Sequence, residues 1–270
     1  MSSLALAQAV WVITIAIWLV IGLYVYSALV RQISVRATPL PAPGMKRFGW
    51  PEALVAALLM SLLLLGLIRG NGAPESKLNT QDLINNFVFT AVIVLLLGGF
   101  LLFRGFDLDA LAGLSKVGII RAIALGVILL VMAYPFVGLA DTITQHLFGY
   151  PSSRQNIVEL FSAAPTMRQR VLIIILAVAV APVAEETVFR FFIYGVLRRY
   201  FGIAAGLLVN ALLFAAVHQH LPSFAPLFVL GSCFTLAYEW SGSVLVPMMM
   251  HSLFNSANLV FLAFPELLQQ

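Results

Sequence analysis

Apolar segments long enough to cross a membrane recur along the whole chain, and they restrict its fold more than any other feature. A helix needs roughly 20 predominantly apolar residues to cross the hydrocarbon core of a bilayer. Segments that approach or exceed this length are 4–30, 52–68, 84–103, 118–140, 168–198, 203–220, 224–240 and 244–263. The pattern predicts an all-α fold, a polytopic transmembrane bundle of about eight helices.

Composition supports the same class of protein. Hydrophobic residues make up 61% of the chain and charged residues only 10%, whereas about a quarter of a soluble domain is charged. The net charge of +4 would also suit nucleic-acid binding, but the basic residues lie between the apolar segments, as the positive-inside rule requires. We therefore expect a multi-pass integral protein of the cell membrane, with lipid as a partner and no nucleic acid.

The N-terminal apolar run and the basic residues predict a topology. The run from Leu4 to Val30 has no basic residues before it and is too long for a signal peptide, so we expect a first transmembrane helix. With the N-terminus outside, nine basic residues fall on the cytoplasmic side: Arg31, Arg36, Lys46, Arg47, Arg104, Lys116, Arg121, Arg198 and Arg199. Five fall on the other side: Arg69, Lys77, Arg154, Arg168 and Arg170. Nine against five favours this orientation.

The linkers divide the chain loosely. We expect N-terminal helices over 1–117, a core that carries the motifs over 118–263 and a short tail over 264–270. The polar stretch 141–167 is predicted to be a loop with a short interfacial helix.

Segment 168–198 is too long for one straight crossing, because 31 residues would reach about 46 Å. Pro182 predicts a kink within it, or a junction between two shorter helices.

Two adjacent carboxylates, Glu185 and Glu186, interrupt this apolar segment directly after the predicted kink. Ionisable groups at bilayer depth are costly and mark functional sites. Arg190 lies four residues after Glu186, so the two side chains share a helical face and can form an ion pair. Glu185 is turned by about 100° from its neighbour, which leaves it available as a general base or acid. The structural alternative is that both carboxylates share the arginine.

Histidines on two later segments complete a candidate reaction centre. Asn210, Phe214 and His218 are spaced by four residues and form one stripe on a helix, which His218 ends. His220 lies nearby and is expected to be an ordinary loop residue rather than part of the site. His251 and Asn255 share one face of the last apolar segment. Such a stripe faces the protein interior or a water-filled cavity, although hydrogen bonds between helices would also account for the asparagine.

These side chains suit chemistry on water. Glu185 would act as the base, and the imidazoles of His218 and His251 would bind a metal or an oxyanion. Neither Cys233 nor Ser252 is placed as a convincing nucleophile, and the zincin motif HExxH is absent from the sequence.

Three short motifs in order resemble the CPBP family of CAAX proteases and bacteriocin-processing enzymes, also called the Abi family. They are Glu-Glu-x-x-x-Arg at 185–190, Phe-x-x-x-His at 214–218 and His-x-x-x-Asn at 251–255. The resemblance covers roughly residues 118–263. It implies an intramembrane endopeptidase whose helices enclose a conical cavity open to one face and to lipid.

The resemblance also implies roles for the site residues. Glu185 would activate water, Glu186 and Arg190 would support it, and His218 would be its partner. His251 and Asn255 would polarise the scissile carbonyl or hold the oxyanion. A zinc or other divalent ion on His218 and His251 and a metal-free water both remain open.

The expected substrate is a peptide or protein anchored to the membrane by a prenyl group, a leader or a transmembrane stub. The alternatives are a proton- or ion-coupled transporter, against which no inverted repeat is visible, and a catalytically silent immunity or scaffold protein.

Overall fold

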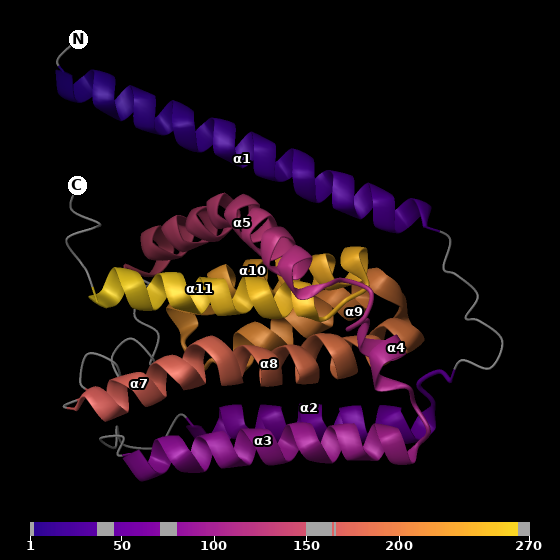
Figure 1. Ribbon diagram of the computed structural model, residues 1–270. Coiled ribbons are helices and arrows are strands. Elements are labelled where there is room, and N and C mark those ends of the chain that lie inside the picture. Colours follow the sequence, from indigo (N-terminus) through magenta and orange to yellow (C-terminus); the bar gives the residue numbers. More distant parts are fainter. Residues whose placement is uncertain (1–2, 37–45, 71–79, 150–163, 165, 264–270) are drawn as a thin grey trace.

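The computed structural model describes residues 3–36, 46–70, 80–149, 164 and 166–263, and every regular element in these ranges is helical (Figure 1). The α-helices are α1 (Ser3–Val35), α2 (Trp50–Gly70), α3 (Thr80–Phe103), α4 (Leu108–Ala112), α5 (Ile119–Phe148), α7 (Met167–Ile175), α8 (Ala181–Glu186), α9 (Gly195–Val217), α10 (Phe224–Ser241) and α11 (Leu245–Ala263). The π-helical segments η1 (Leu176–Val180) and η2 (Thr187–Tyr194) join α7, α8 and α9 end to end, and the 3₁₀ turn η3 (Leu221–Ser223) precedes α10. The predicted all-α class is confirmed.

Each of the eight predicted apolar segments corresponds to helix. Within the described ranges, five helical segments are long and apolar enough to cross a membrane: Ala5–Val35, Trp50–Ile68, Ile119–Leu147, Met167–Val217 and Leu221–Ser241. The 51-residue segment Met167–Val217 contains two of the predicted spans. A shorter apolar stretch, Phe87–Phe103, lies in α3. The protein is therefore a multi-pass membrane protein.

The helices lie in layers around the later half of the chain (Figure 1). The hairpin of α2 and α3 covers one side, where α2 contacts α9 and α3 contacts α7 and α8. On the opposite side α5 packs on α10 and α11, and α1 lies over α5 and α10. The helices that carry the three motifs are thus enclosed between the α2–α3 hairpin and α5.

The helical path through Pro182 excludes one of the two predicted arrangements. The backbone is helical on both sides of this proline, so two separate helices do not meet there. The turn before it is widened into η1 instead. The chain reverses further on, at Gly202, whose φ of 82° and ψ of 176° interrupt α9. This positive φ favours glycine because it lies in a region that side chains rarely adopt.

The polar stretch 141–167 was only partly predicted correctly. Its first eight residues, 141–148, belong to the last turns of α5, which continues as a helix beyond Pro135. Residues 150–163 and 165 lie outside the described part of the chain, so the predicted interfacial helix is not tested. The sequence prediction also missed α4, a short helix that Asp107 caps by accepting a hydrogen bond from the Ala110 N–H at 3.1 Å.

The loop after α4 fixes the turn between α10 and α11. The Val244 N–H donates to Ala112 O at 2.9 Å. Gly113 has a φ of +67°, and a β-carbon at this position would lie 1.9 Å from Gly242 O. Only glycine therefore permits this close contact. The contact anchors the start of α11, the helix that carries His251, against the loop after α4.

The proline inside α5 shows how the bundle satisfies backbone groups within the membrane. Pro135 has no N–H, so the carbonyl of Val131, four residues earlier, lacks its usual helical donor. The Trp18 indole of α1 donates to this carbonyl at 2.9 Å. A side chain from a neighbouring helix thus replaces the missing donor, as expected for prolines in transmembrane helices.

The helix ends and loops that carry the nine basic residues counted as cytoplasmic lie at one end of the bundle. Arg36, after α1, donates to Trp240 O near the end of α10 at 2.5 Å. Lys46, before α2, donates to the Arg104 carbonyl that follows α3. This grouping agrees with the alternation of crossings on which the residue count was based, and the choice of the cytoplasmic side remains a prediction.

Candidate active site

The structure brings the predicted site residues together from three stretches of helix. Glu185 and Glu186 end α8, and Arg190 follows in η2. His218 comes directly after α9, because the helix stops at Val217. His251 and Asn255 lie one turn apart in α11.

The innermost group is the ion pair of Glu186 and Arg190. Their side chains are fully buried, and Arg190 Nη1 lies 2.9 Å from Glu186 Oε1, which confirms the predicted ion pair. Arg190 Nη2 also donates to Gly231 O at 3.2 Å. A β-carbon on Gly231 would lie 2.9 Å from the Phe214 ring, so a residue without a side chain is required where α10 passes this group.

Three aromatic rings enclose the guanidinium. Its carbon lies 4.2 Å from the centre of the Phe214 ring, 5.2 Å from that of Phe234 and 5.9 Å from that of Phe189. Cation–π attraction strengthens when the cation is desolvated, so these rings partly offset the loss of water around Arg190. Sequence reasoning placed Phe214 on the His218 stripe but missed Phe189 and Phe234, which appear in the sequence only as members of a phenylalanine-rich region.

The two histidines are held in matching orientations. The Nδ1 of His218 lies 2.7 Å from Phe214 O, and since a carbonyl can only accept, Nδ1 carries the proton. The Nδ1 of His251 lies 2.9 Å from Glu186 Oε1 and donates to that carboxylate. In each neutral ring Nε2 then bears a lone pair. The Glu186 carboxylate thus accepts hydrogen bonds from both Arg190 and His251.

Both of these Nε2 atoms face the same oxygen of Glu185. The distances to Glu185 Oε2 are 3.9 Å from His218 and 4.0 Å from His251. This oxygen is shielded from solvent and has no hydrogen-bond partner among the described residues. Both Nε2 atoms therefore lie near one carboxylate oxygen, and a group that bridges either nitrogen to this oxygen must bring hydrogen-bond donors or positive charge.

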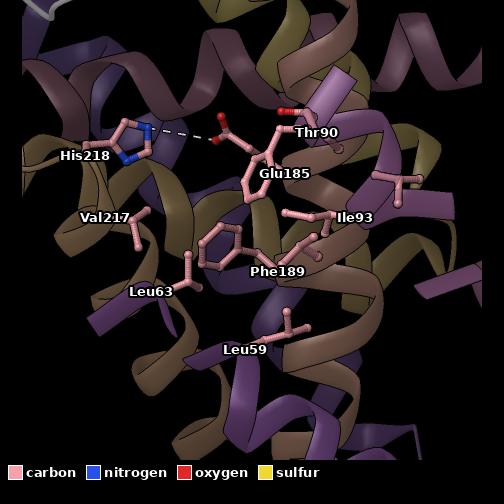
Figure 2. A pocket seen from close by; sticks show the side chains of 12 residues that line it. Leu59, Leu63, Thr90, Ile93, Glu185, Phe189, Val217 and His218 are labelled. Carbon is pink, nitrogen blue, oxygen red and sulfur yellow. Dashed lines mark ion pairs between the residues drawn. The ribbon is translucent and has the colours of Figure 1, made fainter. Parts of the chain in front are cut away.

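A pocket of about 290 Å³ lies beside Glu185 and His218. Figure 2 shows Glu185 and His218 on its upper part, with Phe189 and Val217 below them and side chains of α2 and α3 on the remaining walls. Leu59 and Leu63 come from α2. The Glu185 side chain is 32% exposed although its Oε2 atom is shielded, whereas the Glu186 side chain is fully buried. No motif in the sequence indicates this contribution of the α2–α3 hairpin.

Asn255 is placed differently from the histidines. Its Nδ2 donates to Ala177 O in η1 at 2.8 Å. The role that the resemblance implies for it, with His251, at the scissile carbonyl remains a prediction. His220 hydrogen-bonds Ser223 through Nδ1 at 2.6 Å, which suits the plain loop position expected for it. Cys233 is buried on α10.

The donor set and its spacing give different answers for zinc. Two imidazole nitrogens and a carboxylate are ligands that catalytic zinc uses. A tetrahedral ion would hold such donors about 3.3 Å apart, given zinc–ligand bonds of about 2.0–2.1 Å. The observed 3.9 and 4.0 Å are wider, and no group of His, Cys, Asp or Glu in the described ranges has metal-binding geometry. The arrangement therefore does not fit directly bound zinc.

The fold and the site together define an intramembrane hydrolase, a bundle of membrane helices with a carboxylate and two imidazoles beside an apolar pocket. Residues 167–257 match the family described as type II CAAX prenyl endopeptidase, Rce1-like. This segment contains all three motifs, so the match confirms the resemblance drawn from them, and the family's members are membrane endopeptidases. The match favours a protease over the transporter and scaffold alternatives.

Two relatives agree with this assignment. The chain is 27% identical over 208 residues to YdiL of Bacillus subtilis (strain 168), named as a membrane peptidase; the match covers 76% of this chain and 81% of that protein. It is 30% identical over 148 residues to MroQ of Staphylococcus aureus (strain USA300), named as a membrane-embedded CAAX protease; that match covers 52% of this chain and 58% of MroQ. No solved structure matches the chain.

Proposed function

We propose that the protein cleaves a peptide bond of a membrane-anchored polypeptide with a water molecule activated by Glu185. The convergence of Glu185 Oε2 with the Nε2 atoms of His218 and His251 carries this proposal. A water at this point can donate one hydrogen to the carboxylate and the other to an imidazole, so its oxygen lone pair is free to attack.

The reaction then follows from the protonation states. Glu185 takes a proton from water while the water oxygen bonds to the scissile carbonyl carbon. The tetrahedral intermediate collapses as the carbon–nitrogen bond breaks, and Glu185 returns the proton to the leaving amine. General acid–base transfer of this kind contributes about 10²–10⁴-fold in rate. The Glu186–Arg190 pair holds His251 through its Nδ1 and takes no proton itself.

The pocket supports a substrate with an apolar group beside the scissile bond. Apart from Thr90, Glu185 and His218, the residues that line it are apolar. A prenyl group, as in the family's description, or an apolar transmembrane side chain would both bury hydrocarbon here.

Cleavage of a membrane-anchored peptide by the protein purified in detergent tests the proposal. We expect turnover to persist in 1,10-phenanthroline and in metal-depleted buffer, since the spacing of the site supports a metal-free water. The control is the same treatment of a known zinc peptidase, which must lose activity. Inhibition that added zinc reverses, with zinc bound stoichiometrically, would contradict the metal-free mechanism. Absence of cleavage across substrates with prenyl, leader and transmembrane anchors would contradict the function.

The pocket wall gives a second test. Ile93 of α3 lines the pocket, whereas the adjacent Val92 does not line it and is 44% exposed. We expect Ile93→Trp to lower kcat/KM at least about tenfold by filling the space for the apolar group, the loss expected when more than about 1.4 kcal/mol of binding is removed. The matched Val92→Trp variant should keep wild-type kinetics. Equal kinetics of the two variants would show that substrate does not enter this pocket.

A further inference from the structure

Pro182 leaves one carbonyl of η1 without a backbone donor, close to the catalytic carboxylate. In an α-helical register Ala177 O would accept from the N–H of residue 181, and in a π-helical register from that of residue 182. The Ala181 N–H donates to Leu176 O instead, and residue 182 is a proline with no N–H.

Asn255 supplies the missing donor from α11. Its Nδ2 lies 2.8 Å from Ala177 O. An unsatisfied carbonyl in the apolar part of a membrane protein is costly, so this bond favours one placement of η1 against α11. Asn255 lies one helical turn after His251, and Pro182 lies three residues before Glu185. The bond therefore joins the helical segment that leads to Glu185 to the helix that carries His251, close to the reacting groups.

We propose that Pro182 and Asn255 form a positioning pair that sets the spacing between Glu185 and His251. The proline exposes the Ala177 carbonyl, and the asparagine uses it to hold α8 and α11 in register, with Glu185 Oε2 and His251 Nε2 4.0 Å apart. Asn255 is then a positioning residue that acts through the backbone of η1. Its consequence for catalysis rests on the function proposed above.

A matching arrangement lies away from the site, between α1 and α5. Pro135 exposes Val131 O, and Trp18 of α1 donates to that carbonyl at 2.9 Å. This second pair joins α1 to α5 and touches none of the site residues named above, so it provides a matched control.

A double-mutant cycle between Asn255→Ala and Pro182→Ala tests the proposal. Asn255→Ala should lower kcat about 10²-fold with little change in KM, because a misplacement near 1 Å can cost that much. In the Pro182→Ala background the restored N–H gives Ala177 O a backbone donor, so the same asparagine change should cost at least about tenfold less. If the two losses simply multiply, Asn255 acts directly on the substrate and the proposal is overturned.

Thermal unfolding in detergent separates this result from a failure of the proposed function. Asn255→Ala should lower Tm, and the Tm loss should shrink in the Pro182→Ala background even if no substrate is cleaved. Pro135→Ala should leave the effects of Asn255→Ala unchanged and should shrink only the Tm loss caused by Trp18→Phe. An equal Tm loss from Asn255→Ala with and without Pro182, or recovery by Pro135→Ala, would overturn the proposal.

Discussion

Glu185→Gln should lower the rate of peptide hydrolysis by about 10²-fold or more, because a general base contributes at least that factor. Glutamine keeps the size and most of the polar contacts of glutamate but cannot accept a proton from water. The expected change lies in kcat, with KM nearly unchanged, since Glu185 Oε2 contributes to the reaction point and the pocket walls stay apolar. Steady-state kinetics on a membrane-anchored peptide measures both constants.

The control for this prediction is Glu239→Gln. The Glu239 side chain is also largely buried, at 6% exposed, and it accepts from the Tyr194 hydroxyl at 2.8 Å and pairs with Arg198 at 3.1 Å. It lies in α10 outside the convergent group. The variant should therefore retain wild-type kcat per folded molecule. Full activity of Glu185→Gln would remove Glu185 from the role of base, even if the protein proved to be a peptidase.

Arg190→Met should lower the free energy of unfolding by about 3–5 kcal/mol, the cost of leaving one partner of a buried ion pair without its counter-charge. The variant leaves Glu186 in a site where both side chains are fully buried. It also empties the space between the rings of Phe214 and Phe234. Such a loss is a large share of the 5–15 kcal/mol that stabilises a typical protein. Thermal or denaturant unfolding in detergent measures the change.

Two further variants define the cause of this loss. The double variant Glu186→Gln with Arg190→Met removes both charges, so it should cost less than Arg190→Met alone. Arg198→Met breaks an ion pair whose arginine is 37% exposed and whose carboxylate keeps the hydrogen bond from Tyr194, so it should cost less than Arg190→Met. Equal losses for Arg190→Met and Arg198→Met would show that burial of the Glu186 charge is not what makes Arg190 necessary.

Hydropathy and motif spacing predicted much of the fold and site because both depend on local sequence. The apolar segments had to be helical, since each is near the length that crosses a bilayer. The Glu186–Arg190 pair followed from a four-residue spacing on one helix. A shared site for Glu185, His218 and His251 was expected from ionisable and imidazole side chains within apolar segments, and the resemblance of the three motifs to a known family supported it.

Features that depend on contacts between distant segments were not predictable from the sequence. The π-helical turn before Pro182 is matched by Asn255, which lies 78 residues further on than the carbonyl it binds. The reversal at Gly202 and the short α4 helix likewise depend on local backbone angles and packing that hydropathy does not report. No motif marked the residues of α2 and α3 that line the pocket, because leucine and isoleucine at these positions cannot be distinguished in the sequence from residues that face lipid.

The α2–α3 hairpin lies wholly outside the segment 167–257 that matches the family, yet it forms half of the pocket beside Glu185. Under the proposed function, substrate preference would therefore depend in part on a stretch of the chain that carries none of the catalytic residues. Exchange of this hairpin between homologues offers a route to new cleavage targets in which the hydrolytic machinery is left untouched.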